Sequence, residues 1–173
     1  MGAVKGWFLS GSNPNNYEIG VENKLEPKGN VVAFLKSNNN WFNDEDSFGT
    51  MMQQFSAKKY RGDYKRFELS CLIKTDNLKK SAGLWMQIHS ETGQLIQSDN
   101  TVNRHTYNNR EWNHHTIVID IPKNSEVISF GVILHQTGQV WIKNVSLTEV
   151  GYKKELTNLK SNVIDSPVNL KFI

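Results

Sequence analysis

The sequence predicts an all-β protein that folds as a two-sheet antiparallel β-sandwich. Nine runs rich in β-branched and aromatic residues recur along the 173-residue chain, and no segment keeps the apolar period of a long helix. The predicted strands are 17–22, 31–37, 48–56, 66–74, 83–89, 94–97, 112–121, 127–135 and 139–150. Nine or ten short strands separated by turns are typical of a sandwich.

Clusters of Asn, Gly, Pro and Asp separate these runs and supply the turns. They stand at 13–16, 27–30, 37–40, 91–93 and 122–125. Short helical turns are expected at 57–60 or 77–80, and the sequence shows no internal repeat.

The segment 127–150 indicates the antiparallel architecture most directly. Two apolar-rich runs meet at Gln136-Thr137-Gly138, and Gly138 can take the positive φ that a tight hairpin loop requires. The second run carries Trp141, which we expect, like Trp7, in the core or at its rim.

Period-two alternation assigns the side chains of the predicted strands to two faces. The wholly apolar sets, expected to face the core, are Leu84, Met86, Ile88, Phe130, Val132 and Leu134. The outward sets are Trp85, Gln87, His89, Gly131, Ile133 and His135. Because Gly131 has no side chain, it is expected to leave space for a ligand on that outward face.

Length and composition predict one sandwich domain, 1–150, followed by a C-terminal tail, 151–173, that is docked or partly disordered. The net charge of +3 is too small to imply nucleic acid. No apolar run approaches the roughly 20 residues of a spanning helix, and the first residues lack a signal-peptide pattern. We therefore expect a cytoplasmic protein without a membrane partner.

The single cysteine, Cys71, falls in the middle of a predicted strand. One thiol can form neither an intramolecular disulfide nor a cysteine-based zinc site. We expect it to be buried and inert.

Several blocks of the sequence together carry a family resemblance that covers roughly residues 6–149. They are 6–9 with 17–20, 48–53, 60–62, 82–86, 99–104, 130–132 and 140–142. As a set they resemble a bacterial family of jelly-roll domains similar to carbohydrate-binding modules of the galactose-binding-like type. Relatives often carry an AraC-type transcriptional regulator label. The resemblance implies a jelly-roll fold and a saccharide or small polar ligand.

The chain also departs from this family pattern. Relatives usually have Arg at Gln87 and Asp at His89, and acidic residues near Lys143-Asn144, where related modules can hold a structural calcium. The cationic and neutral pair found here argues against that calcium site. No helix-turn-helix pattern occurs either, so direct nucleic-acid binding is not expected.

The outward face of the central strands is the predicted ligand site. Sugar recognition needs a flat aromatic ring together with amide or guanidinium groups for the hydroxyls. The candidate ligand-binding residues are Gln53, Trp85, Gln87, His89, Asn100, Asn103, Arg104 and His135. The alternative is a covered face, with Trp85 packed under a loop that Arg104 holds in place.

Metal and cofactor chemistry finds little support in the pattern. His114 and His115 are adjacent, so on a strand they point to opposite faces. His89, His105 and His135 are dispersed and would form a zinc site only if the fold gathered them. No metal and no cofactor are therefore expected.

These observations predict a non-catalytic ligand-binding module. No nucleophile elbow, phosphate loop or paired carboxylates stand out. An alternative is a protein-interaction or regulatory module, transcription-associated but without direct DNA binding, in which the exposed face and the tail bind a protein partner. The weakest hypothesis is an enzyme that uses His89 or His135 with Asp99.

Overall fold

The fold is seen in a computed structural model, which describes residues 4–22, 31–39, 41–60, 65–104 and 110–158. These residues form ten strands and two short 3₁₀ helices. The strands are β1 (Phe8–Gly11), β2 (Tyr17–Glu22), β3 (Val32–Ser37), β4 (Phe48–Ser56), β5 (Lys65–Asp76), β6 (Ser81–Ser90), β7 (Leu95–Asn100), β8 (Asn113–Ile121), β9 (Ser125–His135) and β10 (Gln139–Val150). The helices are η1 (Pro14–Asn16) and η2 (Ala57–Lys59).

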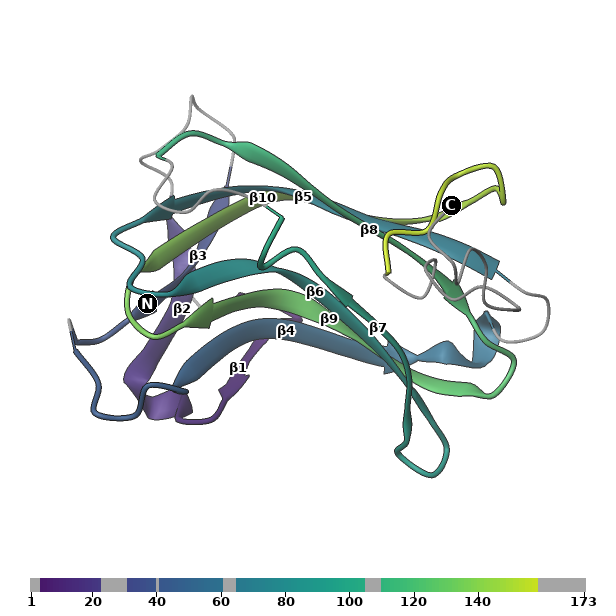
Figure 1. Ribbon diagram of the computed structural model, residues 1–173, viewed down its shortest axis with the longest axis horizontal. Coiled ribbons are helices and arrows are strands. Elements are labelled where there is room, and N and C mark those ends of the chain that lie inside the picture. The colour runs from purple at the N-terminus through teal and green to yellow at the C-terminus, as the bar shows by residue number, and fades with distance from the viewer. Residues whose placement is uncertain (1–3, 23–30, 40, 61–64, 105–109, 159–173) are drawn as a thin grey trace, which may run out of the picture.

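The strands form two five-stranded antiparallel sheets that pack face to face (Figure 1). The first sheet has the order β1-β4-β9-β6-β7 and the second the order β2-β3-β10-β5-β8. All nine predicted strands are present, and β1 adds a tenth. Of the two predicted helical turns, η2 is confirmed, whereas residues 77–80 are not helical in the structure.

The core lies between the sheets and follows the predicted alternation. All six apolar side chains assigned to the inside of β6 and β9 are buried. Cys71 is buried on the inner face of β5, and burial raises the pKa of its thiol to about 12. A thiol with this pKa stays protonated and unreactive at neutral pH.

Trp7 and Trp141 differ in their relation to this core. Trp7 packs at its rim, with its ring 5.6 Å from that of Phe130 in an edge-to-face arrangement. The prediction for Trp141 was wrong. Its indole lies on the outer face of the second sheet, where Nε1 donates a hydrogen bond to Glu22 at 3.1 Å. Val140 and Ile142 take the inward positions instead.

Gly131 also has a different role from the predicted one. A Cβ atom there would lie 2.3 Å from the carbonyl oxygen of Met51 and 2.9 Å from the Cα of Met52. The backbone of β4 therefore occupies the place of a side chain, and the glycine allows β4 and β9 to approach closely. It does not leave space for a ligand.

No helix among the described residues is long and apolar enough to cross a membrane.

Candidate ligand-binding groove

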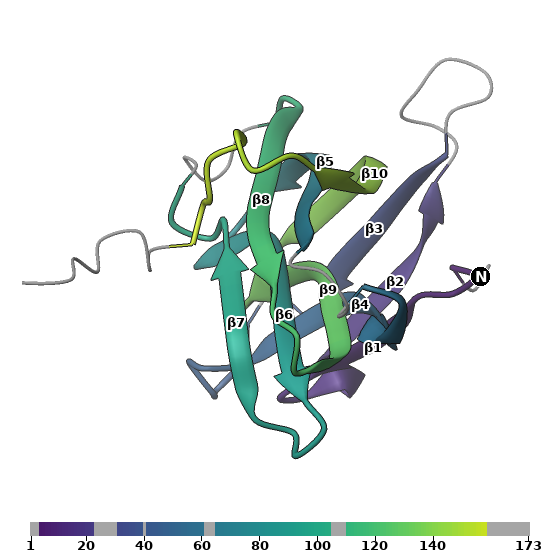
Figure 2. The same ribbon diagram turned by 90° about the vertical axis from the view of Figure 1, so that its right-hand side faces the viewer.

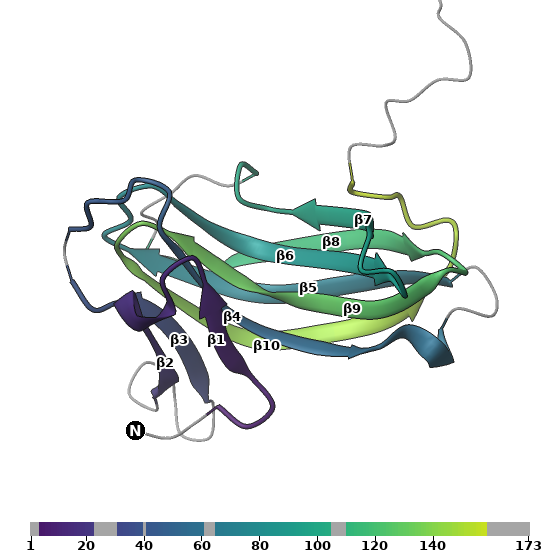
Figure 3. The ribbon, with the colours of Figure 1, turned by 90° about the horizontal axis from the view of Figure 1, so that it is seen from below.

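The outer face of the first sheet is concave and holds a groove of about 590 Å³. The strands of this sheet bow upward in Figure 1, so its concave outer face is turned downward, and Figure 3 is seen from that side. Side chains of β1, β4, β6, β7 and β9 and of residues 102–103 line it. The lining is Ser10, Gly11, Phe48, Thr50, Met52, Gln54, Trp85, Gln87, His89, Ser98, Asp99, Asn100, Val102, Asn103, Ser129, Ile133 and His135.

Antiparallel register arranges the floor of the groove in rows across the sheet. One row holds only polar side chains: Ser98, Gln87, Ser129 and Gln54, one each from β7, β6, β9 and β4. Within it the Gln54 amide donates a hydrogen bond to the Ser129 hydroxyl at 3.1 Å. The next row is Asn100, Trp85, Gly131 and Met52. An aromatic ring thus lies beside a ladder of amides and hydroxyls.

The indole of Trp85 lies along the sheet. Its Nε1 donates a hydrogen bond to the Thr50 hydroxyl at 2.8 Å, and that hydroxyl donates to the carbonyl of Val132 at 2.9 Å. Trp85 is on β6 and Thr50 on β4, with β9 between them, so their backbones are roughly 10 Å apart. A bond across that distance requires the ring to extend over β9, where it lines the groove.

The wall of the groove beside β7 is the loop 101–104. The Thr101 amide donates to the Leu84 carbonyl at 2.9 Å, and the Leu84 amide donates to the Thr101 hydroxyl at 2.9 Å. Beneath it the hydroxyl of Thr101 lies 2.6 Å from Nδ1 of buried His115. The Asn100 side chain accepts from the Val102 amide at 3.0 Å. These bonds hold Val102 beside Gly83 of β6, just past the row that contains Asn100 and Trp85.

His135 and Phe48 lie at the end of the groove away from His89, with ring centroids 5.9 Å apart. Burial lowers the pKa of His135, the charge of nearby Lys80 lowers it further, and Asp46 partly opposes both effects. The ring is therefore held in its neutral form. A neutral imidazole can both donate and accept hydrogen bonds.

The lowered pKa of His135 predicts a loss of stability at acid pH. The unfolded state binds this proton more readily than the folded state does. The contribution of the neutral ring to the free energy of unfolding is therefore complete above the ordinary pKa of about 6.5, and it is lost as the pH drops from there through the folded-state pKa. His135→Gln is expected to remove this part of the pH dependence, measured by urea unfolding between pH 7.5 and 5. The control His114→Gln, at an exposed position of β8, is expected to keep it. Equal profiles for wild type and His135→Gln would contradict the assignment.

The structure brings six of the eight candidate residues together in the groove: Trp85, Gln87, His89, Asn100, Asn103 and His135. Gln53 is not among the lining residues. It alternates with Met52 and Gln54, and the place assigned to it belongs to Gln54. Adjacent pairs Met51-Met52 and Gln53-Gln54 hide the period-two pattern, which explains this error.

Arg104 also lies outside the groove. Its guanidinium contacts the Asp99 carboxylate and donates to the Thr157 carbonyl at 2.7 Å. This matches the alternative in which Arg104 holds a loop in place. The lining residues outside the candidate set include the small or apolar Ser10, Thr50, Met52, Ser98, Val102 and Ser129. They also include Ile133, which the alternation of β9 had already placed on the outward face. Correct alternation in β4 is the signal that could have found Thr50 and Met52.

The acidic and imidazole side chains of the described groove lining, His89, Asp99 and His135, come from three different strands. No group of three or more His, Cys, Asp or Glu side chains among the described residues could hold a metal ion, and His105 lies outside those residues. Asp99 borders the groove, but its carboxylate accepts from Arg104 and from the Thr157 hydroxyl. The lysines and arginines of the described residues lie outside this lining.

Comparison with known proteins places this geometry in context, although no protein-family model matches the chain. The chain is 43% identical over 171 residues to the uncharacterized HTH-type transcriptional regulator YbfP of Bacillus subtilis (strain 168). That match covers 98% of this chain and 57% of the relative, so the chain spans little more than half of the relative's length.

Three solved structures show the same fold at low sequence identity. The C-terminal family 22 carbohydrate-binding module of Clostridium thermocellum Xyn10B has a TM-score of 0.56 and 14% identity over 87% of this chain and 90% of its own. The CBM22-1 xylan-binding domain of Paenibacillus barcinonensis Xyn10C gives 0.55 and 11% over 87% and 89%. The bacteriophage CBA120 tailspike protein 4 gives 0.62 and 12% over 86% of this chain and 20% of its own. The predicted all-β, two-sheet antiparallel β-sandwich is confirmed.

Proposed function

We propose that the protein is a non-catalytic ligand-binding module and that the concave groove of the first sheet binds a neutral saccharide. The observation that carries this proposal is the flat Trp85 indole beside an in-register row of amides and hydroxyls. The C–H face of a pyranose packs on such a ring while its hydroxyls pair with the neighbouring polar groups.

The charges of the groove favour an uncharged ligand. The described lining carries neither lysine nor arginine, and the Asp99 carboxylate is paired with Arg104. A uronic acid or a sulfated sugar would lose its hydration in the groove without gaining an ion pair, which is costly. A neutral oligosaccharide exchanges water hydrogen bonds for those of the polar row.

The structural likeness to carbohydrate-binding modules supports a saccharide as the ligand. The relative from Bacillus subtilis, named as a transcriptional regulator, supports a regulatory context for ligand binding. Our second candidate is a regulatory module of a longer transcription-associated protein, one that binds a ligand or a protein partner and leaves DNA binding to another part. The named regulator, of which this chain spans 57%, is the observation that favours it.

A glycan array that contains neutral, uronate-bearing and sulfated oligosaccharides tests the proposal. We expect binding confined to neutral members, with affinities measured afterwards by calorimetry. Binding confined to anionic members would contradict the neutral ligand class while leaving a sugar site in place. No binding to any member, together with capture of a protein partner, would favour the interaction module instead.

A further inference from the structure

Residues 151–158, which follow β10, cross the open side of the sandwich between its two sheets. β8 is the edge strand of the second sheet and β7 the edge strand of the first. Figure 2 shows the yellow segment passing over β8 toward β7. Two sheet edges that expose backbone groups are thus joined by one short segment of chain.

Thr157 makes the central contacts of this segment. Its amide donates to the Val118 carbonyl at 2.9 Å, and its hydroxyl accepts from the Val118 amide at 2.7 Å. The same hydroxyl donates to the Asp99 carboxylate at 2.5 Å. One side chain therefore joins the edge of β8 to β7. Next to it the Asn158 amide donates to the Gln97 side chain at 2.9 Å.

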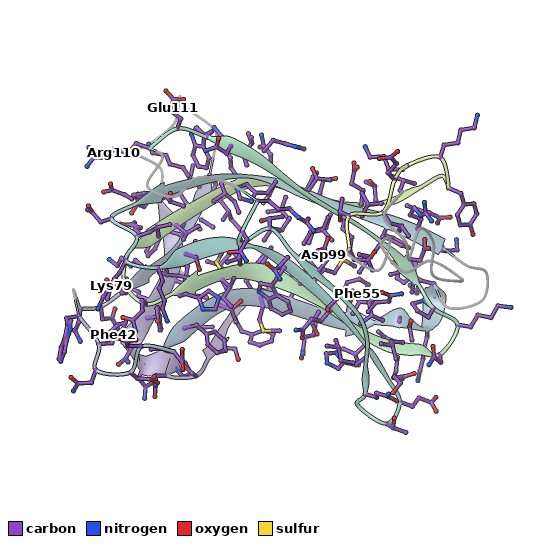
Figure 4. All side chains as sticks on the ribbon, in the orientation of Figure 1. Phe42, Phe55, Lys79, Asp99, Arg110 and Glu111 are labelled. Atoms are coloured by element: carbon purple, nitrogen blue, oxygen red, sulfur yellow. The ribbon has the colours of Figure 1, made fainter. Side chains whose placement is uncertain are left out.

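Successive side chains of β7 contact the groove and the C-terminal segment in alternation. Ser98 and Asn100 point to the groove, while Gln97 and Asp99 bond the C-terminal segment. The Asp99 side chain is only 6% exposed, beside the segment in Figure 4. A buried carboxylate needs its partners, because leaving it unpaired is costly.

Arg104 extends this network into the groove wall. Its guanidinium bonds both Asp99 and the Thr157 carbonyl, and Arg104 ends the loop that places Val102 and Asn103 over the groove. We propose that residues 151–158 are a strap for the groove wall, so that the strap and the wall 99–104 dock and release as one unit. A change in the strap would then alter the groove, and occupation of the groove would stabilise the docked strap.

Thr157→Val tests this coupling without any ligand, so its failure is distinct from failure of the proposed function. Valine keeps the size of the side chain but removes the hydroxyl that joins Asp99 to Val118. Hydrogen exchange at the Thr101 and Arg104 amides, both bonded in the wall, is expected to speed up about tenfold. Thr157→Ser restores the hydroxyl and is expected to restore protection. Glu155→Gln, an exposed change in the same strap, should leave it unchanged.

Native-state exchange of the wild-type chain in mild urea supplies a measurement that needs no variant. The amides of Thr157, Thr101 and Arg104 are expected to open together, with one free energy and one dependence on urea. Wall amides that keep wild-type protection in Thr157→Val, or that open separately from Thr157 in the wild type, would overturn the proposal.

Discussion

Trp85→Ala is expected to weaken binding of a neutral oligosaccharide by at least about tenfold, or about 1.4 kcal/mol. The variant removes the aromatic floor of the groove and frees the Thr50 hydroxyl from its indole partner. Because Trp85 is only half-buried and faces outward, the free energy of unfolding is expected to fall by only about 1–2 kcal/mol. Calorimetry on the tightest neutral ligand of the glycan array and urea unfolding measure the two effects.

Trp141→Ala is the matched control for this experiment. It removes the same side chain from the outer face of the opposite sheet, where the indole bonds Glu22. Its affinity for the oligosaccharide is expected to equal that of the wild type. If Trp85→Ala instead kept full affinity, the ligand would bind elsewhere. If it unfolded the protein, Trp85 would belong to the core.

Gly131→Ala is expected to destabilise the protein by about 3 kcal/mol or more, the largest stability effect we predict. The new methyl group would lie 2.3 Å from the Met51 carbonyl oxygen, and backbone on both sides is fixed by the ladder between β4 and β9. Unlike a flexible side chain, that backbone cannot move aside without breaking hydrogen bonds. Urea unfolding measures the change.

Gly151→Ala serves as the control for Gly131→Ala, since nothing lies within 4 Å of a Cβ atom at that position. Its effect is expected to stay within about 0.5 kcal/mol. A Gly131→Ala variant as stable as this control would contradict the close approach of β4 and β9. It would also reopen the idea that Gly131 leaves room for a ligand.

The sequence predicted the fold well because alternation is clear where one face is purely apolar. Leu84, Met86 and Ile88 leave no doubt about the faces of β6, so the outward position of Trp85 followed correctly. The run Val140-Trp141-Ile142 is apolar on both faces, and composition could not decide which residue turns outward. The strand β1 is only four residues long and carries no pattern of its own.

The candidate groove was predicted in part, for reasons that depend on distance along the chain. Trp85, Gln87 and His89 share one strand, and local alternation suffices for them. The placement of Gln53 in the groove was wrong because the adjacent pairs Met51-Met52 and Gln53-Gln54 conceal the alternation of β4. The strap contact between Asp99 and Thr157 joins residues 58 positions apart, and no local pattern predicts it.

The central claim is that the outer face of the first sheet binds a neutral oligosaccharide on Trp85. The most direct test follows the indole N–H signals of Trp85 and Trp141 by NMR during titration with a panel of neutral hexasaccharides that includes xylohexaose. We predict that the Trp85 signal shifts with a saturable dependence on one or more members while the Trp141 signal, on the opposite face, stays in place. Saturable shifts at Trp141 alone, or no saturable shift at Trp85 with any member, would contradict the claim.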